Sequence, residues 1–261
     1  MTFADTHTHL YLEDFDEDRE EELRLCEEAG VRHLFFPNIN MDSLAPMLRL
    51  CSEHPHCHPM IGLHPSEVKE DYETVLAEMM GRIGEAPFAG IGEIGMDLYW
   101  DKSFAEEQKK ALHAQLLLSQ ERDLPAVIHC RRAFAETWEV IRLLQGPLRG
   151  VFHCFAGDTA QARLVISRGF MIGVGGVVTY KNSGLQEVVR NVDIRHILLE
   201  TDAPFLPPVP YRGKRNASHY IPLIAQRVAE LKNLPLETVA EATTANAKQL
   251  FGDVGEDKDI R

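Results

Sequence analysis

Short apolar runs alternate with longer amphipathic stretches along almost the whole chain, and this alternation constrains the fold more than any other feature. We count eight apolar runs, at residues 3–5, 33–37, 60–63, 88–91, 126–129, 150–153, 170–174 and 197–199. The stretches between them are typical of helices; residues 105–122, for example, are rich in Glu, Gln, Lys and Leu and contain no Gly or Pro. Eight strand–helix units in 261 residues predict an α/β fold, a (β/α)8 barrel of the TIM type, which takes roughly 250 residues.

An open, doubly wound sheet is the main alternative to the barrel. That fold commonly binds nucleotides through a GxGxxG or GxxxxGK[ST] turn after a strand, and neither motif follows any of the predicted strands. The chain also shows no internal repeat, low-complexity segment or linker, and the proline cluster at 204–210 is typical of a rigid loop. We therefore expect residues 1–261 to form one barrel domain with its site at the C-terminal ends of the strands.

Composition and charge exclude several classes of protein. There is no apolar run of about 18 residues to span a membrane, and the first residues do not resemble a signal peptide. Five scattered cysteines argue against a disulfide framework, so we expect a cytoplasmic protein. With 27 basic and 40 acidic residues, the net charge of −13 argues against coating nucleic acid by bulk electrostatics. This charge still allows an enzyme that binds one phosphate through metal ions. No feature of the sequence indicates a protein partner.

Histidines and carboxylates recur where the predicted strands end. One HxH pair alone is weak evidence, but here such residues end several strands: His7, His9, His64, Glu93, His129, His153, Glu200 and Asp202. In a barrel all these strand ends converge on one rim, where active sites lie. Packed or surface histidines do not explain a pattern repeated at so many strand ends. The sequence therefore predicts a metal site at this rim.

The chemistry of these residues limits which metal ions the site would bind. Imidazole and carboxylate ligands suit Zn²⁺ and Mn²⁺, and Mg²⁺ is tolerated where oxygens dominate. Four imidazoles and two carboxylates exceed the needs of one tetrahedral ion with an open position, but they suffice for two divalent ions sharing a bridging carboxylate. From chain order we assign Glu93 as the bridge. His7, His9 and Asp202 would complete one ion, and His129 with His153 the other.

Several ordered motifs make the chain similar to the TatD family of metal-dependent deoxyribonucleases, within the wider metal-dependent hydrolase barrels, over nearly its whole length. These motifs are Asp5-Thr6-His7-Thr8-His9-Leu10, Gly62-Leu63-His64-Pro65, Gly92-Glu93-Ile94-Gly95, Ile128-His129 with Arg131 and Ala133, His153-Cys154-Phe155-Ala156-Gly157, Gly175-Gly176-Val177-Val178-Thr179-Tyr180-Lys181, Glu200-Thr201-Asp202-Ala203-Pro204 and Asn246-Ala247 before Phe251-Gly252.

The resemblance implies hydrolysis of phosphodiester bonds in DNA, commonly from a 3′ end, by water that the metal ions activate. It supports six metal ligands: His7, His9, Glu93, His129, His153 and Asp202. It also implies that Asp202 doubles as the base that orients or deprotonates this water. The related amidohydrolases often bridge their metals with a carbamylated lysine, whereas Glu93 would fill that role here without modification.

Two further residues have open roles. Glu200, two positions before Asp202, would be a further ligand or a proton acceptor, or else a supporting carboxylate inside the barrel. His64 would contact the scissile phosphate or protonate the leaving oxygen, or else be a rim histidine held by a carbonyl group.

Candidate substrate contacts are cationic or aromatic. Arg131 follows a predicted ligand and would stabilise charge on phosphate oxygens, and Arg212, Lys214 and Arg215 form a local basic patch suited to the DNA backbone. The alternative for that patch is a solvated loop. The family often has Glu-Pro after the Asn of this loop, where this chain has Ala217-Ser218 after Asn216. Tyr99 and Trp100 would stack on a base or pack over the rim.

Two other functions compete with a DNase. The same site would serve a metal-dependent amidase or an aminoacyl-ester deacylase, which would cleave esters and leave DNA intact. A catalytically silent metal-binding scaffold would bind metal without turnover, although the complete ligand set argues against lost catalysis.

Overall fold

The computed structural model describes residues 1–252, and within them eight parallel strands pair in chain order. The strands are β1 (Phe3–Asp5), β2 (Val31–Phe36), β3 (Cys57–Ile61), β4 (Gly90–Asp97), β5 (Ala126–Arg131), β6 (Gly150–Phe152), β7 (Phe170–Val174) and β8 (Ile197–Leu199). The ends of β1 and β8 meet, because the Thr6 backbone N–H donates to Leu199 O at 3.0 Å and Thr8 bridges to Ala203. The predicted (β/α)8 barrel is therefore confirmed.

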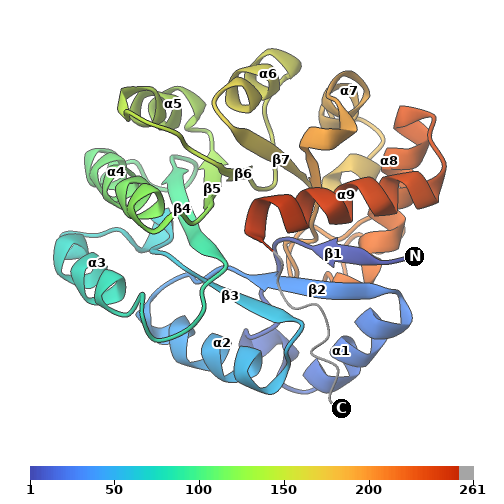
Figure 1. Ribbon diagram of the computed structural model, residues 1–261, viewed down its shortest axis with the longest axis horizontal. Helices are drawn as coiled ribbons and strands as arrows, with labels where there is room; N and C mark the ends of the chain where they lie inside the picture. Colours follow the sequence, from blue (N-terminus) through green and yellow to red (C-terminus); the bar gives the residue numbers. More distant parts are fainter. Residues whose placement is uncertain (253–261) are drawn as a thin grey trace.

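Helices surround the strands, as Figure 1 shows. They are α1 (Arg19–Glu28), α2 (Met41–Glu53), α3 (Tyr72–Gly81), α4 (Ala105–Arg122), α5 (Phe134–Leu143), α6 (Thr159–Ser167), α7 (Leu185–Asn191), α8 (Ile221–Lys232) and α9 (Leu236–Phe251). The long helix predicted at 105–122 is α4. Among residues 1–252, no helix combines the length and apolar character needed to cross a bilayer.

Several strands differ from the predicted bounds by one or two residues, and β3 and β4 depart from them most. The fourth run was expected at 88–91, but β4 extends to Asp97, with Gly95 opposite His129 and Asp97 opposite Arg131. The apolar pattern stops early because Glu93 interrupts it, and this carboxylate points into a polar site rather than an apolar core. The third run was expected at 60–63, whereas β3 begins at Cys57.

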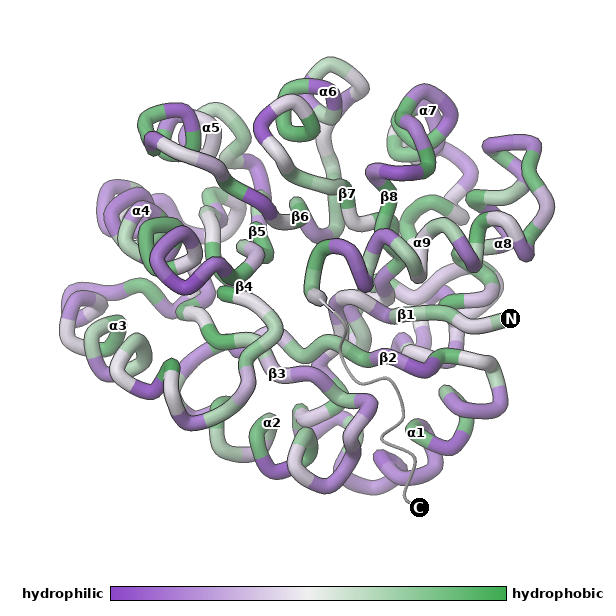
Figure 2. The backbone as a smooth tube through the Cα atoms, in the orientation of Figure 1, coloured by the Kyte–Doolittle hydropathy of each residue, from purple (hydrophilic) through white to green (hydrophobic). Residues whose placement is uncertain are grey.

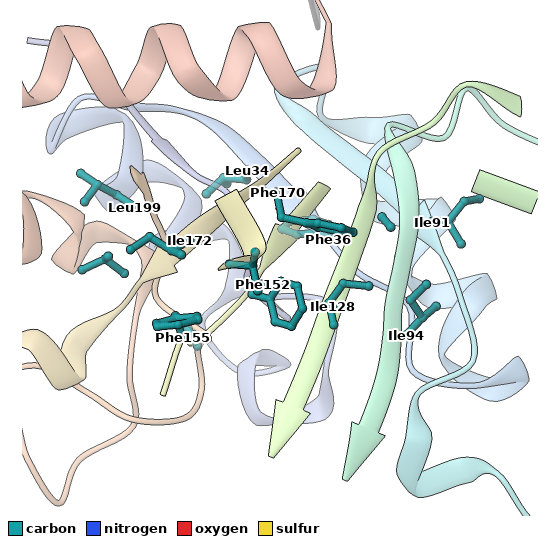
Figure 3. Packing of buried hydrophobic residues seen from close by; sticks show 14 of the residues in the cluster. Leu34, Phe36, Ile91, Ile94, Ile128, Phe152, Phe155, Phe170, Ile172 and Leu199 are labelled. Atoms are coloured by element: carbon teal, nitrogen blue, oxygen red, sulfur yellow. The ribbon is translucent and has the colours of Figure 1, made fainter. Parts of the chain in front are cut away.

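The apolar residues of the strands divide between two environments, because successive side chains point to opposite faces of the sheet. Residues such as Ile128, Phe152 and Ile172 pack between the strands and the outer helices; Figure 3 shows Ile128 and Phe152 on neighbouring strands of this layer. Val127 and Val151 instead belong to a second cluster inside the barrel. Figure 2 shows the green, hydrophobic stretches along the strands and purple, hydrophilic stretches on the outer turns of the helices.

Helix α9 covers the N-terminal end of the barrel. It packs against β1 and β8, crosses in front of the strands in Figure 1, and adds Leu250 and Phe251 to the interior cluster. The Phe251 ring lies 4.3 Å from that of Phe35, centroid to centroid. The lower interior is thus filled by apolar groups, and a polar layer lies above it at the opposite end.

Candidate dinuclear metal centre

The histidines of the β1 end lie against two carboxylates. Nε2 of His7 is 3.2 Å from Glu93 Oε2, and Nε2 of His9 is 3.7 Å from the same oxygen. Oδ1 of Asp202 lies 3.7 Å from His7 Nε2 and 3.6 Å from His9 Nε2. The backbone N–H of Asp202 donates to His7 O at 2.9 Å, so β1 and the residues after β8 set this geometry together.

The other oxygen of Glu93 faces the histidines of β5 and β6. Oε1 is 2.8 Å from Nδ1 of His129 and 2.8 Å from Nε2 of His153. These two ligands follow Val127 and Val151 by two residues, so strand periodicity places them directly above the apolar interior. The predicted ligands therefore meet as two groups, one on each oxygen of a single carboxylate.

The buried imidazoles fit divalent metal ions. His7 is fully buried and neither of its ring nitrogens has a hydrogen-bond partner among the described residues. Its ring stacks on that of His153 at 3.8 Å with an interplanar angle of 10°. Burial, followed by the charge of His153, lowers the pKa of His7 to about 4. A neutral imidazole with unused lone pairs beside two carboxylates fits a zinc- or manganese-type site.

Neighbouring groups orient two of these rings. The Tyr11 hydroxyl donates to Pro37 O at 2.6 Å, and so it accepts from Nδ1–H of His9 at 3.0 Å. That bond directs the lone pair of His9 Nε2 toward the carboxylates. A hydrogen bond to the outer nitrogen of a ligating histidine commonly orients the ring in this way.

His129 is oriented by a residue to which we assigned no role. Asp97 Oδ2 lies 3.0 Å from Nε2 of His129. The other ring nitrogen, Nδ1, therefore faces Glu93 and the candidate metal centre. Burial lowers the pKa of His129, but hydrogen bonds to Asp97 and Glu93 outweigh it and raise this pKa to about 9. Counting by twos along β4 from Glu93 leads to Asp97, so the period of the strand is the sequence signal that could have identified it.

Glu200 lies behind His153 rather than at the surface of the site. Its carboxyl is fully buried, and Oε1 accepts from the backbone N–H of Cys154 and lies 3.9 Å from His153 Nδ1. Burial, with the charge of Asp202, raises the pKa of Glu200 well above its usual range. Gly173 makes room for it, because a Cβ there would lie 2.2 Å from Glu200 Oε2. This position favours the supporting role over substrate contact.

His64 presents an N–H to the site. Its Nδ1 accepts from the backbone N–H of Ser66 at 3.1 Å, so in the neutral ring the proton lies on Nε2. Nε2 is 3.3 Å from Glu93 Oε1. Burial lowers the pKa of His64. A neutral ring with this tautomer suits a hydrogen-bond donor to phosphate.

The predicted substrate cations differ in their surroundings. The Arg131 guanidinium lies 4.0 Å over the Tyr99 ring, and that of Arg212 lies 4.5 Å over the Tyr180 ring. Lys214 is exposed. Arg215 pairs with both oxygens of Asp18, at 2.7 and 2.6 Å. That ion pair favours a structural role for Arg215, whereas Arg212 and Lys214 stay candidates for substrate contacts.

Comparison with known proteins identifies the family of the chain. A family model described as TatD related DNase matches residues 4–252. The chain is 35% identical to an uncharacterized metal-dependent hydrolase, YabD of Bacillus subtilis, over 95% of this chain and 98% of that one. It is 32% identical to the 3'-5' ssDNA/RNA exonuclease TatD of Erwinia amylovora, covering 95% and 99% of the two chains.

A solved structure is similar over the same length. The crystal structure of YjjV, a TatD homolog from Escherichia coli K12, superimposes with a TM-score of 0.90 at 30% identity, covering 95% of this chain and 97% of that one. An uncharacterized amidohydrolase from Saccharomyces cerevisiae, at 17% identity and a TM-score of 0.80, shares the fold. The predicted family is confirmed: the chain is a metal-dependent hydrolase that belongs to the TatD-related DNase family.

Proposed function

We propose that this hydrolase cleaves phosphodiester bonds in DNA, removing nucleotides from a 3′ end with the help of two divalent metal ions. The surroundings of the Glu93 carboxylate support this proposal most directly, because each of its two oxygens faces a separate group of histidine nitrogens. The activity named for the Erwinia relative has the same direction of cleavage.

The distances to Glu93 support one division of the predicted ligands between the two proposed ions. His7, His9 and Asp202 would hold one ion, His129 and His153 the other, and Glu93 would bridge them. Zn²⁺, Mn²⁺ and Mg²⁺ are the candidates. Two ions at such a centre lower the pKa of water and neutralise charge on a phosphate.

The protein's own groups would then move protons and hold the substrate. Asp202 is 14% exposed, more than Asp97 at 9% or Glu93 at 4%, so it is the ligand carboxylate best placed to accept a proton from attacking water. The Nε2–H of His64 would donate to a phosphate oxygen or to the leaving group. Asp97 would orient His129 through their hydrogen bond, and Glu200 lies behind His153 as a buried carboxyl group.

The decisive experiment uses metal-stripped protein reloaded separately with Mg²⁺, Mn²⁺ or Zn²⁺. The substrates are single- and double-stranded oligonucleotides labelled at the 5′ end. We expect a ladder of products that shortens one nucleotide at a time, with at least one of the metals. His129→Ala is the matched variant that lacks one ligand nitrogen.

Two outcomes would overturn the proposal. Turnover of an amide or aminoacyl-ester panel with every oligonucleotide left intact would identify the enzyme as an amidase or a deacylase. Stoichiometric metal binding without turnover of any phosphodiester or ester would instead indicate a silent scaffold in this member of the family.

A further inference from the structure

A cavity of about 450 Å³ opens beside the His153 end of the metal centre. Tyr99 from the loop after β4 lines one part of it, and Phe155 from the loop after β6 lines another. His153 itself contributes to the wall, so the cavity is continuous with the ligand cluster. Its lining is mostly apolar, and its size lies within the range of small-molecule sites.

Tyr99, Arg131 and Arg132 line the cavity as a group of one aromatic ring and two cations, with Trp100 beside them. The Arg131 guanidinium lies 4.0 Å from the Tyr99 ring centroid and 5.6 Å from that of Trp100. The Arg132 guanidinium lies 4.8 Å from the same Tyr99 ring. Trp100 is 79% exposed, which is unusual for so large an apolar side chain. The exposed Trp100 ring and the partly exposed Tyr99 ring, which is 38% exposed, therefore offer flat surfaces beside the cavity.

The two arginines also keep their charge available. Within residues 1–252 neither Arg131 nor Arg132 forms an ion pair with a carboxylate. Arg132 adopts a left-handed backbone conformation, with φ of +52°, which is uncommon for a residue with a side chain. In a chain with a net charge of −13, two arginines on one aromatic ring beside the metal ligands favour an anionic ligand with an aromatic part.

Gln161 adds a polar group to this wall. Its Oε1 accepts from the backbone N–H of Asp158 at 3.0 Å, which fixes the orientation of the amide. Its two N–H donors have no acceptor in the described part of the chain. An oriented donor in a mostly apolar wall suits a carbonyl oxygen or a ring nitrogen of a base.

We propose that this cavity is a nucleobase subsite, which binds the base of the nucleotide whose phosphate lies at the His129–His153 end of the centre. Tyr99 would stack on the base, Arg131 and Arg132 would offset the phosphate charge, and Gln161 would donate to the base edge. The subsite rests on the proposed nuclease function, because it needs a nucleotide at the metal centre.

Calorimetric titration of the metal-loaded protein tests the subsite without turnover. The probes are dAMP and deoxyribose 5-phosphate, which lacks the base. We expect dAMP to bind at least about tenfold more tightly, the usual scale of one base–aromatic stack. Binding of dAMP should also quench the fluorescence of the exposed Trp100.

Three variants locate the effect. Tyr99→Ala should weaken dAMP binding about tenfold and leave binding of the sugar phosphate unchanged. Ala156→Trp, which fills the cavity from an exposed wall position, should abolish the advantage of dAMP. Tyr180→Ala is the matched control, because Tyr180 also stacks with an arginine, at 4.5 Å, but does not line the cavity; it should keep the advantage.

Equal affinity for the two probes in the unaltered protein would overturn the subsite, as would unchanged dAMP binding in Ala156→Trp. These failures are separate from failure of the proposed function. DNA cleavage without any base-dependent binding contradicts only the subsite. Base-dependent binding in the cavity without cleavage of any oligonucleotide contradicts only the nuclease function.

Discussion

Glu93 lies in the middle of the candidate metal centre. Its carboxylate is 4% exposed and lies within 3.3 Å of four imidazoles, those of His7, His64, His129 and His153. A shorter or neutral side chain at this position cannot present two charged oxygens to two groups of ligands. The effect of changing it should therefore be on metal content more than on folding.

We expect Glu93→Ala to bind fewer than two equivalents of metal and to lose activity by more than about a hundredfold, the scale for a group that stabilises developing charge. Metal analysis and circular dichroism of the purified variant are the measurements. Glu121→Ala, an exposed position on α4, is the control. Two bound equivalents with near-normal turnover would refute the bridging role.

Gly173 is required by its neighbour, not by its own backbone. A methyl group there would lie 2.2 Å from Glu200 Oε2 and 3.0 Å from His153 Cα. We expect Gly173→Ala to lower the free energy of unfolding by about 1–3 kcal/mol, the usual cost of overpacking a core. Urea denaturation measures this change. Gly184→Ala, whose added methyl would meet no atom within 4 Å, should cost much less, and equal losses would contradict the argument.

At the scale of elements, α9 closes the N-terminal end of the barrel. Phe251 is 7% exposed and packs on Phe35 across the N-terminal opening. We expect Phe251→Ala to lower the free energy of unfolding by about 3–5 kcal/mol, as for other buried aromatic truncations. The control Leu143→Ala, at a position that is 60% exposed on α5, should change it by less than about 0.5 kcal/mol. Thermal or urea denaturation distinguishes the two.

The loop between β8 and α8 contains two kinds of cation. Arg212 and Lys214 are exposed, whereas Arg215 is paired with Asp18. If the first two contact phosphates, their double alanine variant should flatten the logarithmic salt dependence of single-strand binding by about 1.4, or roughly 0.7 per contact. Fluorescence anisotropy across a salt series measures the slope. Arg215→Ala should keep the slope but lower stability, and a flattened slope in this variant would reverse the assignment.

At the scale of the whole molecule, acid should weaken the fold through its buried histidines. His58 on β3 is 8% exposed, and its Nε2 lies 3.4 Å from Nδ1 of His33. Burial, with smaller effects of His33 and His56, lowers the pKa of His58 to about 3. The unfolded chain, with a histidine pKa near 6.5, then binds more protons than the folded chain between about pH 3 and pH 6.5. Stability is therefore lost as the pH falls through this window.

His58→Gln should reduce that loss. One histidine contributes at most about 1.4 kcal/mol per pH unit, so the variant should lose up to about 2 kcal/mol less than the unaltered protein between pH 6.5 and 5. Urea denaturation at the two pH values is the measurement. His113→Gln, at an exposed position on α4, should show the same loss as the unaltered protein. Identical losses in both variants would contradict the argument.

The sequence alone determined the class of fold and the set of residues that meet in the centre. Alternating apolar and amphipathic segments specify strands and helices through their local periods of 2 and 3.6 residues, and a barrel brings every strand end to one rim. The positions of His7, His129 and His153 at strand ends were therefore sufficient to predict that they come together. The bounds of β4 were wrong because Glu93 breaks the apolar pattern that defines a strand in sequence.

Only the tertiary structure decided which atoms meet. One oxygen of Glu93 faces His7 and the other faces Nδ1 of His129. Arg215 pairs with Asp18. Each of these contacts joins residues that are far apart in the chain. Such contacts depend on strand stagger and side-chain packing, which no local period encodes. The burial of Glu200 is the clearest case, because the space for its carboxyl is left by Gly173 on a neighbouring strand.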